Sequence, residues 1–254
     1  MATDASRREP KYQRIANALK AEIRSGVLGA GSRIPGENDL MAQYGVARMT
    51  VRQALSVLQS EGLTEARKGV GVFVRTFQPL RRRGIQRLAR EQWGTGRSVW
   101  DADLGDGREL VVDQVEVREG AAPESVARVL GLGVGERVWS RSRRFVLDGK
   151  PVLLSTSYLP ASLVEGSVIT QPDTGPGGIY ARLAELGHRP VHFREEIRSR
   201  MPLPEEALKL SLPAGTPVML VCRTAFAEEG RRPVEVNEMV LDAAAYVLEY
   251  DFDA

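Results

Sequence analysis

The sequence predicts an α+β protein of two domains, an N-terminal winged helix-turn-helix followed by a C-terminal antiparallel sheet with helices. Helix and turn signals fill residues 34–74, and six strand-like runs follow residue 110. Residues 1–90 carry 17 Lys and Arg against 7 Asp and Glu, whereas residues 91–254 carry 18 against 26. A basic head beside an acidic body is typical of a chain in which one domain binds a polyanion. We expect domains at 1–76 and 100–254, with a basic linker at 77–99.

The first helix of the predicted motif opens after Pro35-Gly36. Glu37 and Asp39 fall in its first turn, where the helix dipole favours anions. Gly45 ends it, because a tight turn between two helices needs the backbone freedom of glycine.

The second helix begins near Ala47 and has two distinct faces. Apolar residues recur at helical spacing, at Val51, Ala54, Leu55 and Leu58. The opposite face carries Arg48, Thr50, Arg52 and Gln53. Arg48 and Arg52 lie one turn apart near the helix start, the end that such motifs insert into the major groove.

A basic hairpin completes the motif. Gly62 is a helix stop, and the runs Leu63–Arg67 and Val72–Arg75 flank the tip Lys68-Gly69-Val70-Gly71. Such a tip suits contact with phosphates, as a wing does. The alternative is that these charged residues are only a solvated face.

The N-terminal residues resemble the GntR superfamily of bacterial transcription regulators. The likeness includes Tyr12, Ile15, Ala16, Leu19, Ile23, Gly26, Leu28, Gly31, Leu40, Gly45, Val46, Arg48, Thr50, Val51, Arg52, Ala54, Leu55, Leu58, Glu61, Gly62, Leu63, Gly69, Gly71, Phe73 and Val74. Gly36 and Ala47 stand where the family usually has Ser, so two capping hydroxyls are missing. The resemblance implies contacts to double-stranded DNA by Lys11, Tyr12, Arg33, Glu37, Arg48, Met49, Thr50, Arg52, Gln53, Arg67, Lys68, Gly69 and Gly71. Met49 is placed to meet a thymine methyl.

The linker stretch from Phe77 to about Gly96 is rich in arginine and has few apolar residues. It holds Arg81, Arg82, Arg83, Arg87 and Arg90. Two readings stay open: a flexible, solvated tether, or an arm that adds sequence-independent phosphate contacts.

Beyond the linker the pattern becomes extended. The predicted strands are LVVDQVEV, ERVWSRSRRFVL, KPVLLSTSYLP, PVHFREEIRSR, TPVMLVCRTAFA and RPVEVNEMVL. Helices are expected at about 124–130, 178–186 and 204–210. Asp148-Gly149 is a hairpin signal between two of the strands, and an antiparallel sheet covered by helices follows.

Residues from about 100 to 252 resemble the UTRA domain, the effector-binding domain of the HutC subfamily. The likeness rests on ERVWSRSRRFVLDGKPV, Ser157–Pro160, Gly178–Gly187, PEEALKLSLPAGTPV and RPVEVNEMVLDAAAYVLEYDF. Such domains are similar to a chorismate-lyase fold that has exchanged catalysis for ligand sensing. The resemblance therefore implies a transcription factor with a small-molecule pocket.

The effector residues expected from this resemblance are Arg141, Arg143, Phe145, Ser155, Ser157, Gly177, Gly178, Glu235 and Asn237. Sugar-phosphate-sensing relatives alternate two arginines on one strand, but Phe145 stands at the second position. Ser155 stands where those relatives have a glutamate. These changes favour a ligand that is less anionic than a phosphosugar, with an apolar ring as an option. Thr174–Gly178 leads into a helix and is either an anion-binding loop or merely a flexible one.

Other chemistry finds little support. Cys222 lies in an apolar run that we interpret as a buried strand position. Pro190 separates His188 from His192 on a strand, so we expect no metal and no cofactor. Nucleophile, phosphate-loop and dinucleotide motifs are absent, so we predict that the protein is not an enzyme. No apolar run approaches the roughly 20 residues of a membrane span, and the polar N-terminus favours a cytoplasmic protein without membrane contact.

We therefore expect a sequence-specific DNA-binding regulator, most simply a repressor. A homodimer joined through the C-terminal domains would match a pseudo-palindromic operator. A small-molecule effector would modulate operator binding. The alternatives are a chorismate-lyase-like enzyme fused to a DNA-binding head, and a DNA-binding protein without effector.

Overall fold

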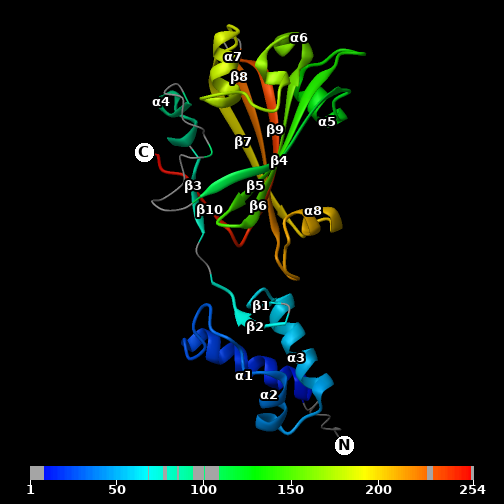
Figure 1. Ribbon diagram of the computed structural model, residues 1–254, viewed down its shortest axis with the longest axis vertical. Coiled ribbons are helices and arrows are strands. Elements are labelled where there is room, and N and C mark those ends of the chain that lie inside the picture. Colours follow the sequence, from blue (N-terminus) through cyan, green and yellow to red (C-terminus); the bar gives the residue numbers. More distant parts are fainter. Residues whose placement is uncertain are drawn as a thin grey trace, which may run out of the picture. The chain divides into compact units, whose positions relative to one another are not determined.

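A computed structural model describes residues 9–67, 69–76, 79–84, 86–93, 100, 109–227 and 231–252. The chain forms two compact units, Met1–Gln78 with Leu212–Thr216 and Pro79–Ser211 with Pro217–Ala254. Figure 1 labels their elements. The predicted fold class is confirmed: a winged helix-turn-helix and an antiparallel sheet with helices.

The described residues of the first unit form three helices and a hairpin. These are α1 (Lys11–Ser25), α2 (Glu37–Tyr44), α3 (Arg48–Ser60), β1 (Thr64–Arg67) and β2 (Gly71–Val74). The two strands pair antiparallel. Apolar faces of all three helices meet in one core, made of Ile15, Ala16, Leu19, Ile34, Leu40, Val51, Ala54, Leu55, Leu58 and Val74.

The turn between α2 and α3 follows the sequence prediction. Gly45 adopts φ +60°, and its N–H donates to the carbonyl of Met41 at 3.0 Å. At the start of α2, the N–H of Gly36 donates to the Asp39 carboxylate at 3.1 Å. Ala47 caps α3 without a side-chain hydrogen bond. The helices are thus held by glycine geometry and core packing, although the capping hydroxyls are missing.

The second unit is built on a six-stranded antiparallel sheet. Its order is β4-β5-β6-β9-β8-β7. The bounds are β4 (Leu110–Gly120), β5 (Val138–Leu147), β6 (Lys150–Pro160), β7 (Pro190–Arg200), β8 (Val218–Ala227) and β9 (Arg232–Asp242). Asp148 and Gly149 join β5 to β6 with φ of +49° and +81°. Positive φ at both positions is the geometry of a tight hairpin turn.

Helices lie on both faces of this sheet (Figure 1). The inner face, which carries the cavity described below, packs against η1 (Gln86–Leu88), α4 (Arg90–Trp93), α6 (Ala161–Val164), η3 (Val168–Thr170) and α7 (Gly178–Glu185). The outer face packs against α5 (Glu124–Leu130) through Val126 and Leu130. The short helix α8 (Pro204–Lys209) precedes β8. Among the described helices, none has the length and apolarity to cross a membrane.

Part of the predicted linker is folded, which differs from the sequence interpretation. β3 (Leu80–Arg83) pairs in parallel with β10 (Tyr246–Glu249), with Leu80 opposite Tyr246 and Arg83 opposite Glu249. Leu80 and Arg82 are buried, whereas Arg81 and Arg83 are exposed. Because one of its two buried positions is an arginine, this strand does not show the alternation of apolar and polar residues by which strands are recognised. Arg87 is buried as well, so neither Arg82 nor Arg87 belongs to a solvated arm.

Candidate DNA interface and ligand cavity

The helix α3 presents a polar face to solvent. Arg48, Met49, Arg52 and Gln53 are exposed on it, while Thr50 is half-buried. Met49 keeps 71% of its surface exposed and is therefore available for contact. An exposed helix face with two arginines and a methionine has the composition of a helix that reads base edges.

Glu37 holds both arginines of this face. Its Oε1 lies 2.8 Å from Arg52 Nε, and its Oε2 lies 3.6 Å from Arg48 Nε. Arg48 also donates from Nη2 to Asn38 Oδ1 at 3.0 Å. The first turn of α2 thereby restricts the rotamers of side chains on α3. Restricting them before binding lowers the entropy cost of placing the guanidinium groups.

The hairpin of β1 and β2 brings Arg33 and Arg67 to the wing. Gly71 has φ +142°, and a Cβ there would lie 2.8 Å from Arg33 Nε, so the arginine rests directly on the glycine backbone. Arg67 pairs with Glu65 at 2.9 Å, and its guanidinium lies 4.3 Å from the centre of the Phe73 ring. Lys68, predicted at the wing tip, lies outside the described residues.

The other predicted DNA-binding residues differ in exposure. Lys11 is exposed at the start of α1, whereas Tyr12 is half-buried and packs against the core of the first unit. Gly69 takes φ +74° at the hairpin tip. Tyr12 therefore helps to pack α1 against the core, and part of its side chain remains accessible.

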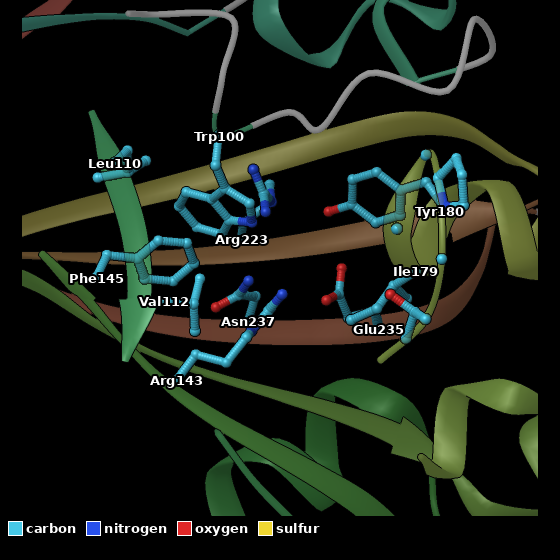
Figure 2. A pocket seen from close by; sticks show the side chains of 15 residues that line it. Trp100, Leu110, Val112, Arg143, Phe145, Ile179, Tyr180, Arg223, Glu235 and Asn237 are labelled. Carbon is cyan, nitrogen blue, oxygen red and sulfur yellow. The ribbon is translucent and has the colours of Figure 1, made fainter. Parts of the chain in front are cut away.

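A cavity of about 330 Å³ lies on the inner face of the sheet in the second unit. Figure 2 shows the side chains that project into it from β4, β5, β8, β9 and α7. Its lining consists of Trp100, Leu110, Val112, Arg143, Phe145, Thr174, Gly175, Pro176, Gly177, Gly178, Ile179, Tyr180, Arg223, Glu235 and Asn237. The volume and the mixed lining suit a small polar molecule.

A row of polar side chains crosses the sheet beneath this cavity. We call it the polar row: Arg141, Ser157, Asn237, Arg223 and Glu195, each paired in register with the next. The first four are buried, and the side chain of Glu195 is 8% exposed. Because paired residues share one face of a sheet, this register gathers five polar groups on the inner face.

Several buried polar atoms of the cavity lack partners among the described residues. They include Glu235 Oε2, Asn237 Nδ2 and Arg223 Nε. These three side chains are at most 1% exposed. Buried polar groups are normally hydrogen-bonded, and leaving one unpaired costs about 1–3 kcal/mol. The cavity is therefore shaped for a ligand that supplies the missing donors and acceptors.

The charges of the cavity favour an anion. Arg143 and Arg223 line it against a single carboxylate, Glu235. Burial lowers the pKa of the Arg143 guanidinium, yet an arginine keeps its charge in proteins. Burial also raises the pKa of Tyr180 well above its ordinary value, so the hydroxyl remains protonated and able to donate. Figure 2 shows this hydroxyl turned toward Glu235.

Two aromatic rings form one wall. Trp100 and Phe145 are tilted by 40° with centroids 4.5 Å apart. The guanidinium groups of Arg143 and Arg223 each lie 5.7 Å from the Trp100 ring centre. Cations beside an aromatic face are stabilised by its quadrupole, so this wall places two arginines around one ring.

The glycine loop before α7 also lines the cavity. Gly175, Gly177 and Gly178 all adopt positive φ, between +64° and +79°. These conformations keep the backbone close to the cavity without side chains in the way. The N-terminus of α7 adds backbone N–H groups that favour an anion.

The predicted effector residues divide into two groups. Arg143, Phe145, Gly177, Gly178, Glu235 and Asn237 line the cavity, whereas Arg141, Ser155 and Ser157 are buried outside its lining. Arg141 donates to the carbonyls of Ile169, Gln171 and Pro172 and so fixes the chain that leads to the glycine loop.

The two serines orient cavity side chains. Ser155 Oγ donates to Asn237 Oδ1 at 2.9 Å, and Arg143 Nη2 donates to Ser157 Oγ at 3.3 Å. Both hydroxyls are buried, so these bonds are shielded from water. Ser155 and Ser157 thus support the lining without being part of it.

Sequence reasoning missed six lining residues outside the glycine loop: Trp100, Leu110, Val112, Ile179, Tyr180 and Arg223. An arginine inside an apolar strand was a usable signal for Arg223, because a charge there needs a buried partner. The prediction for its neighbour Cys222 was wrong: the thiol is half-buried on the outer face rather than fully buried. Strand alternation turns Arg223 inward and Cys222 outward.

Comparisons with known proteins match both parts of the chain. Residues 11–74 match the family described as bacterial regulatory proteins, gntR family, and residues 105–247 match the UTRA domain. An uncharacterised HTH-type transcriptional regulator of Streptomyces coelicolor is 33% identical, with 96% of this chain and 93% of the relative covered. The HTH-type transcriptional repressor NagR of Bacillus subtilis is 28% identical over 87% and 86%. A crystal structure of a GntR-family transcriptional regulator matches with 26% identity and a TM-score of 0.63, covering 97% and 98%.

Proposed function

Because the chain belongs to the GntR family of bacterial regulatory proteins and carries a UTRA domain, we propose that it is a ligand-responsive repressor. It is a transcriptional regulator of the GntR and UTRA type, a class in which relatives are named as repressors. A homodimer binds a pseudo-palindromic operator, since a two-fold protein matches a two-fold site.

The operator is read by the exposed face of α3. Arg48 and Arg52 contact bases, with guanine O6 and N7 the preferred acceptors for a guanidinium. Met49 lies between them in sequence and meets thymine methyl groups. Arg33, Arg67 and the wing backbone hold phosphates and add affinity without reading sequence.

The effector occupies the cavity of the second unit. The observation that carries this proposal is the set of buried polar atoms without partners, on Glu235, Asn237 and Arg223. A fitting ligand bears an anionic group for the two arginines and a hydrogen-bond donor for Glu235. The Trp100 and Phe145 wall favours a flat or apolar part between these groups.

Ligand and operator affinities are linked. If the effector lowers operator affinity, operator DNA lowers effector affinity by the same factor. The loss of operator affinity levels off at saturating effector when the effector binds the second unit, whereas a molecule that competes with DNA for the basic first unit shows no such plateau.

The test uses the full chain. Operator fragments are first selected from random duplexes by repeated binding, and the consensus should be a pseudo-palindrome. Organic acids, amino acids, phosphosugars and aromatic metabolites are then tested for release of that operator. We expect a compound that releases the operator from the wild type and fails with Arg143→Gln.

Three results would contradict the proposal. Selection without a consensus would remove sequence-specific reading, and a full panel without any release would favour effector-independent DNA binding. Conversion of a panel compound into a product would favour an enzyme fused to a DNA-binding head.

A further inference from the structure

We propose that Glu195, which binds Arg82 on β3, also positions the cavity residue Arg223. When an anion in the cavity neutralises Arg223, the bond between Glu195 and Arg82 strengthens and β3 is held more firmly. This inference rests on the ligand cavity of the proposed function and deepens it. It assigns to three buried charged residues a role in transmitting occupancy of the cavity to the strand that follows the first unit in sequence.

One carboxylate serves two arginines. Glu195 on β7 binds Arg82 on β3 through two hydrogen bonds, Nη1 to Oε2 at 2.9 Å and Nη2 to Oε1 at 2.5 Å. Its Oε1 also lies 3.9 Å from Arg223 Nη1 on β8. Arg82 and Arg223 are 1% exposed and Glu195 is 8% exposed. Shielding from water makes the competition between the two cations for this one anion strong.

Arg223 binds Glu195 more weakly than Arg82 does, and of the two arginines it is the one that lines the cavity. The 3.9 Å separation is too long for a hydrogen bond. Among the described residues, Arg223 Nε and Nη1 have no hydrogen-bond partner. Figure 2 shows the guanidinium projecting into the cavity beside Trp100. An anion in the cavity therefore meets a guanidinium with free donors, whose one ion pair among the described residues is with a carboxylate that Arg82 already binds.

Glu195 also joins β3 to the C-terminal strand. Tyr250, just beyond β10, donates its hydroxyl to Glu195 Oε2 at 3.2 Å. β3 and β10 pair in parallel, and Arg81 Nη1 lies 2.9 Å from Glu249 Oε2. Glu195 is thus an anchor for both strands of this small sheet. Its bond to Arg82 therefore adds to the strand pairing and to buried Leu80 in holding β3.

The contact of Glu195 with β3 matters because β3 directly follows the first unit in the sequence. The strand begins at Leu80, two residues after Gln78, the last residue of the first unit before the second unit begins. An anion that neutralises Arg223 removes one cation that competes with Arg82 for Glu195, and the ion pair between Arg82 and Glu195 strengthens. Occupancy of the cavity then appears as firmer attachment of the strand that follows the first unit in the sequence.

Hydrogen exchange tests the shared carboxylate without requiring an identified effector. Amide exchange of β3, normalised to the central strand β6, is measured in the full chain for wild type, Arg223→Gln, Glu195→Gln and the double variant. Arg143→Gln is the matched control, because Arg143 lines the same cavity but has no ion pair with Glu195 among the described contacts.

We expect Arg223→Gln to slow β3 exchange by about fivefold, the lower end of coupling between sites. Glu195→Gln should accelerate it, and Arg223→Gln should then change nothing further. Arg143→Gln should leave β3 at the wild-type rate. Arg223→Lys keeps the positive charge near Glu195 and should restore the wild-type rate, which separates positioning from a general loss of packing.

The proposal is overturned if Arg223→Gln leaves β3 unchanged, accelerates its exchange, or acts equally in the Glu195→Gln background. It is also overturned if Arg143→Gln reproduces the effect. Because no DNA or effector enters this measurement, its failure is independent of failure in operator selection. A chain that binds no operator but shows the coupling would refute the proposed function alone.

Discussion

Glu37 Oε1 lies 2.8 Å from Arg52 Nε, so an acid in the first turn of α2 is bound to a side chain on the face that we propose reads DNA. The same carboxylate approaches Arg48 at 3.6 Å. One anion thereby fixes the direction of two cations that must meet base edges a turn apart. Both pairs are exposed, so their own contribution to stability is small and their role is orientation.

Replacing Arg52 by alanine should weaken binding to the selected operator by about 1–3 kcal/mol, the usual worth of a bidentate base contact. Binding to unrelated duplex should fall much less. The measurement is a titration of both duplexes at one salt concentration. Arg128→Ala on α5 removes the same charge from an exposed helix and should have no effect on either duplex. Equal losses on both duplexes would refute base reading by Arg52.

Glu37→Gln should reduce discrimination while strengthening non-specific binding. Removing an anion from the DNA-facing surface increases attraction to phosphates. Without Glu37, the side chains of Arg48 and Arg52 sample more rotamers and are less well aligned with base edges. We expect the free-energy gap between operator and unrelated duplex to shrink by about 1 kcal/mol. Glu65→Gln is the control, because it makes the same charge change beside Arg67 of the wing. An unchanged gap in Glu37→Gln would contradict the orienting role.

Gly71→Ala should distort the wing. The residue has φ +142°, and the new Cβ would lie 2.8 Å from Arg33 Nε. We expect a loss of about 1 kcal/mol or more in the free energy of unfolding of the first unit, together with weaker binding to all duplexes. Gly69→Ala at φ +74° meets no atom within 4 Å and isolates backbone strain from the clash. Thermal melts and DNA titrations of both variants would decide, and equal effects would argue against the contact with Arg33.

Acid should weaken the second unit through Glu195. Burial alone raises the pKa of this carboxylate, but the ion pair with Arg82 and the positive charges of Arg223 and Arg87 together outweigh burial, and the net pKa is lowered. A lowered folded-state pKa gives stability that is present above the unfolded value, near 4.3, and is lost as pH falls through the folded value. The stability gap between wild type and Glu195→Gln should therefore close on acidification from pH 6 to pH 3.

Denaturant titrations at several pH values measure this gap. Glu196→Gln, at an exposed neighbour on the same strand, serves as the control and should show no comparable closure. A gap between wild type and Glu195→Gln that stays constant down to pH 3 would show that the ion pair contributes no net stability.

The sequence predicted those elements whose signals are local. Gly45 turned the chain where a glycine was required, and Asp148-Gly149 made the hairpin between β5 and β6. β6 runs over the predicted residues, and α5 spans the predicted range. Strand alternation also put Arg143 and Phe145 on the cavity side. In each case the information lay within a few residues of the feature.

What was missed depends on partners far away in sequence. Arg82 looked like part of a solvated basic stretch, because its partner Glu195 lies 113 residues further on. Arg141 was placed on the correct face, yet its guanidinium reaches the backbone near Ile169 instead of the cavity. No local pattern distinguishes an arginine that binds a ligand from one that binds carbonyl groups.

The parallel pairing of β3 with β10 also affects the order in which parts of the chain can fold during synthesis. The partners Leu80 and Tyr246 are 166 positions apart. At synthesis rates of about 5–20 residues per second, roughly 8–33 seconds separate the two strands on the ribosome. The helices and hairpin of the first unit are complete before β3 is synthesised, whereas β3 must wait for the last strand of the chain. Each nascent molecule therefore passes through a period in which its DNA-binding head exists and the strand that would carry a ligand signal has no partner.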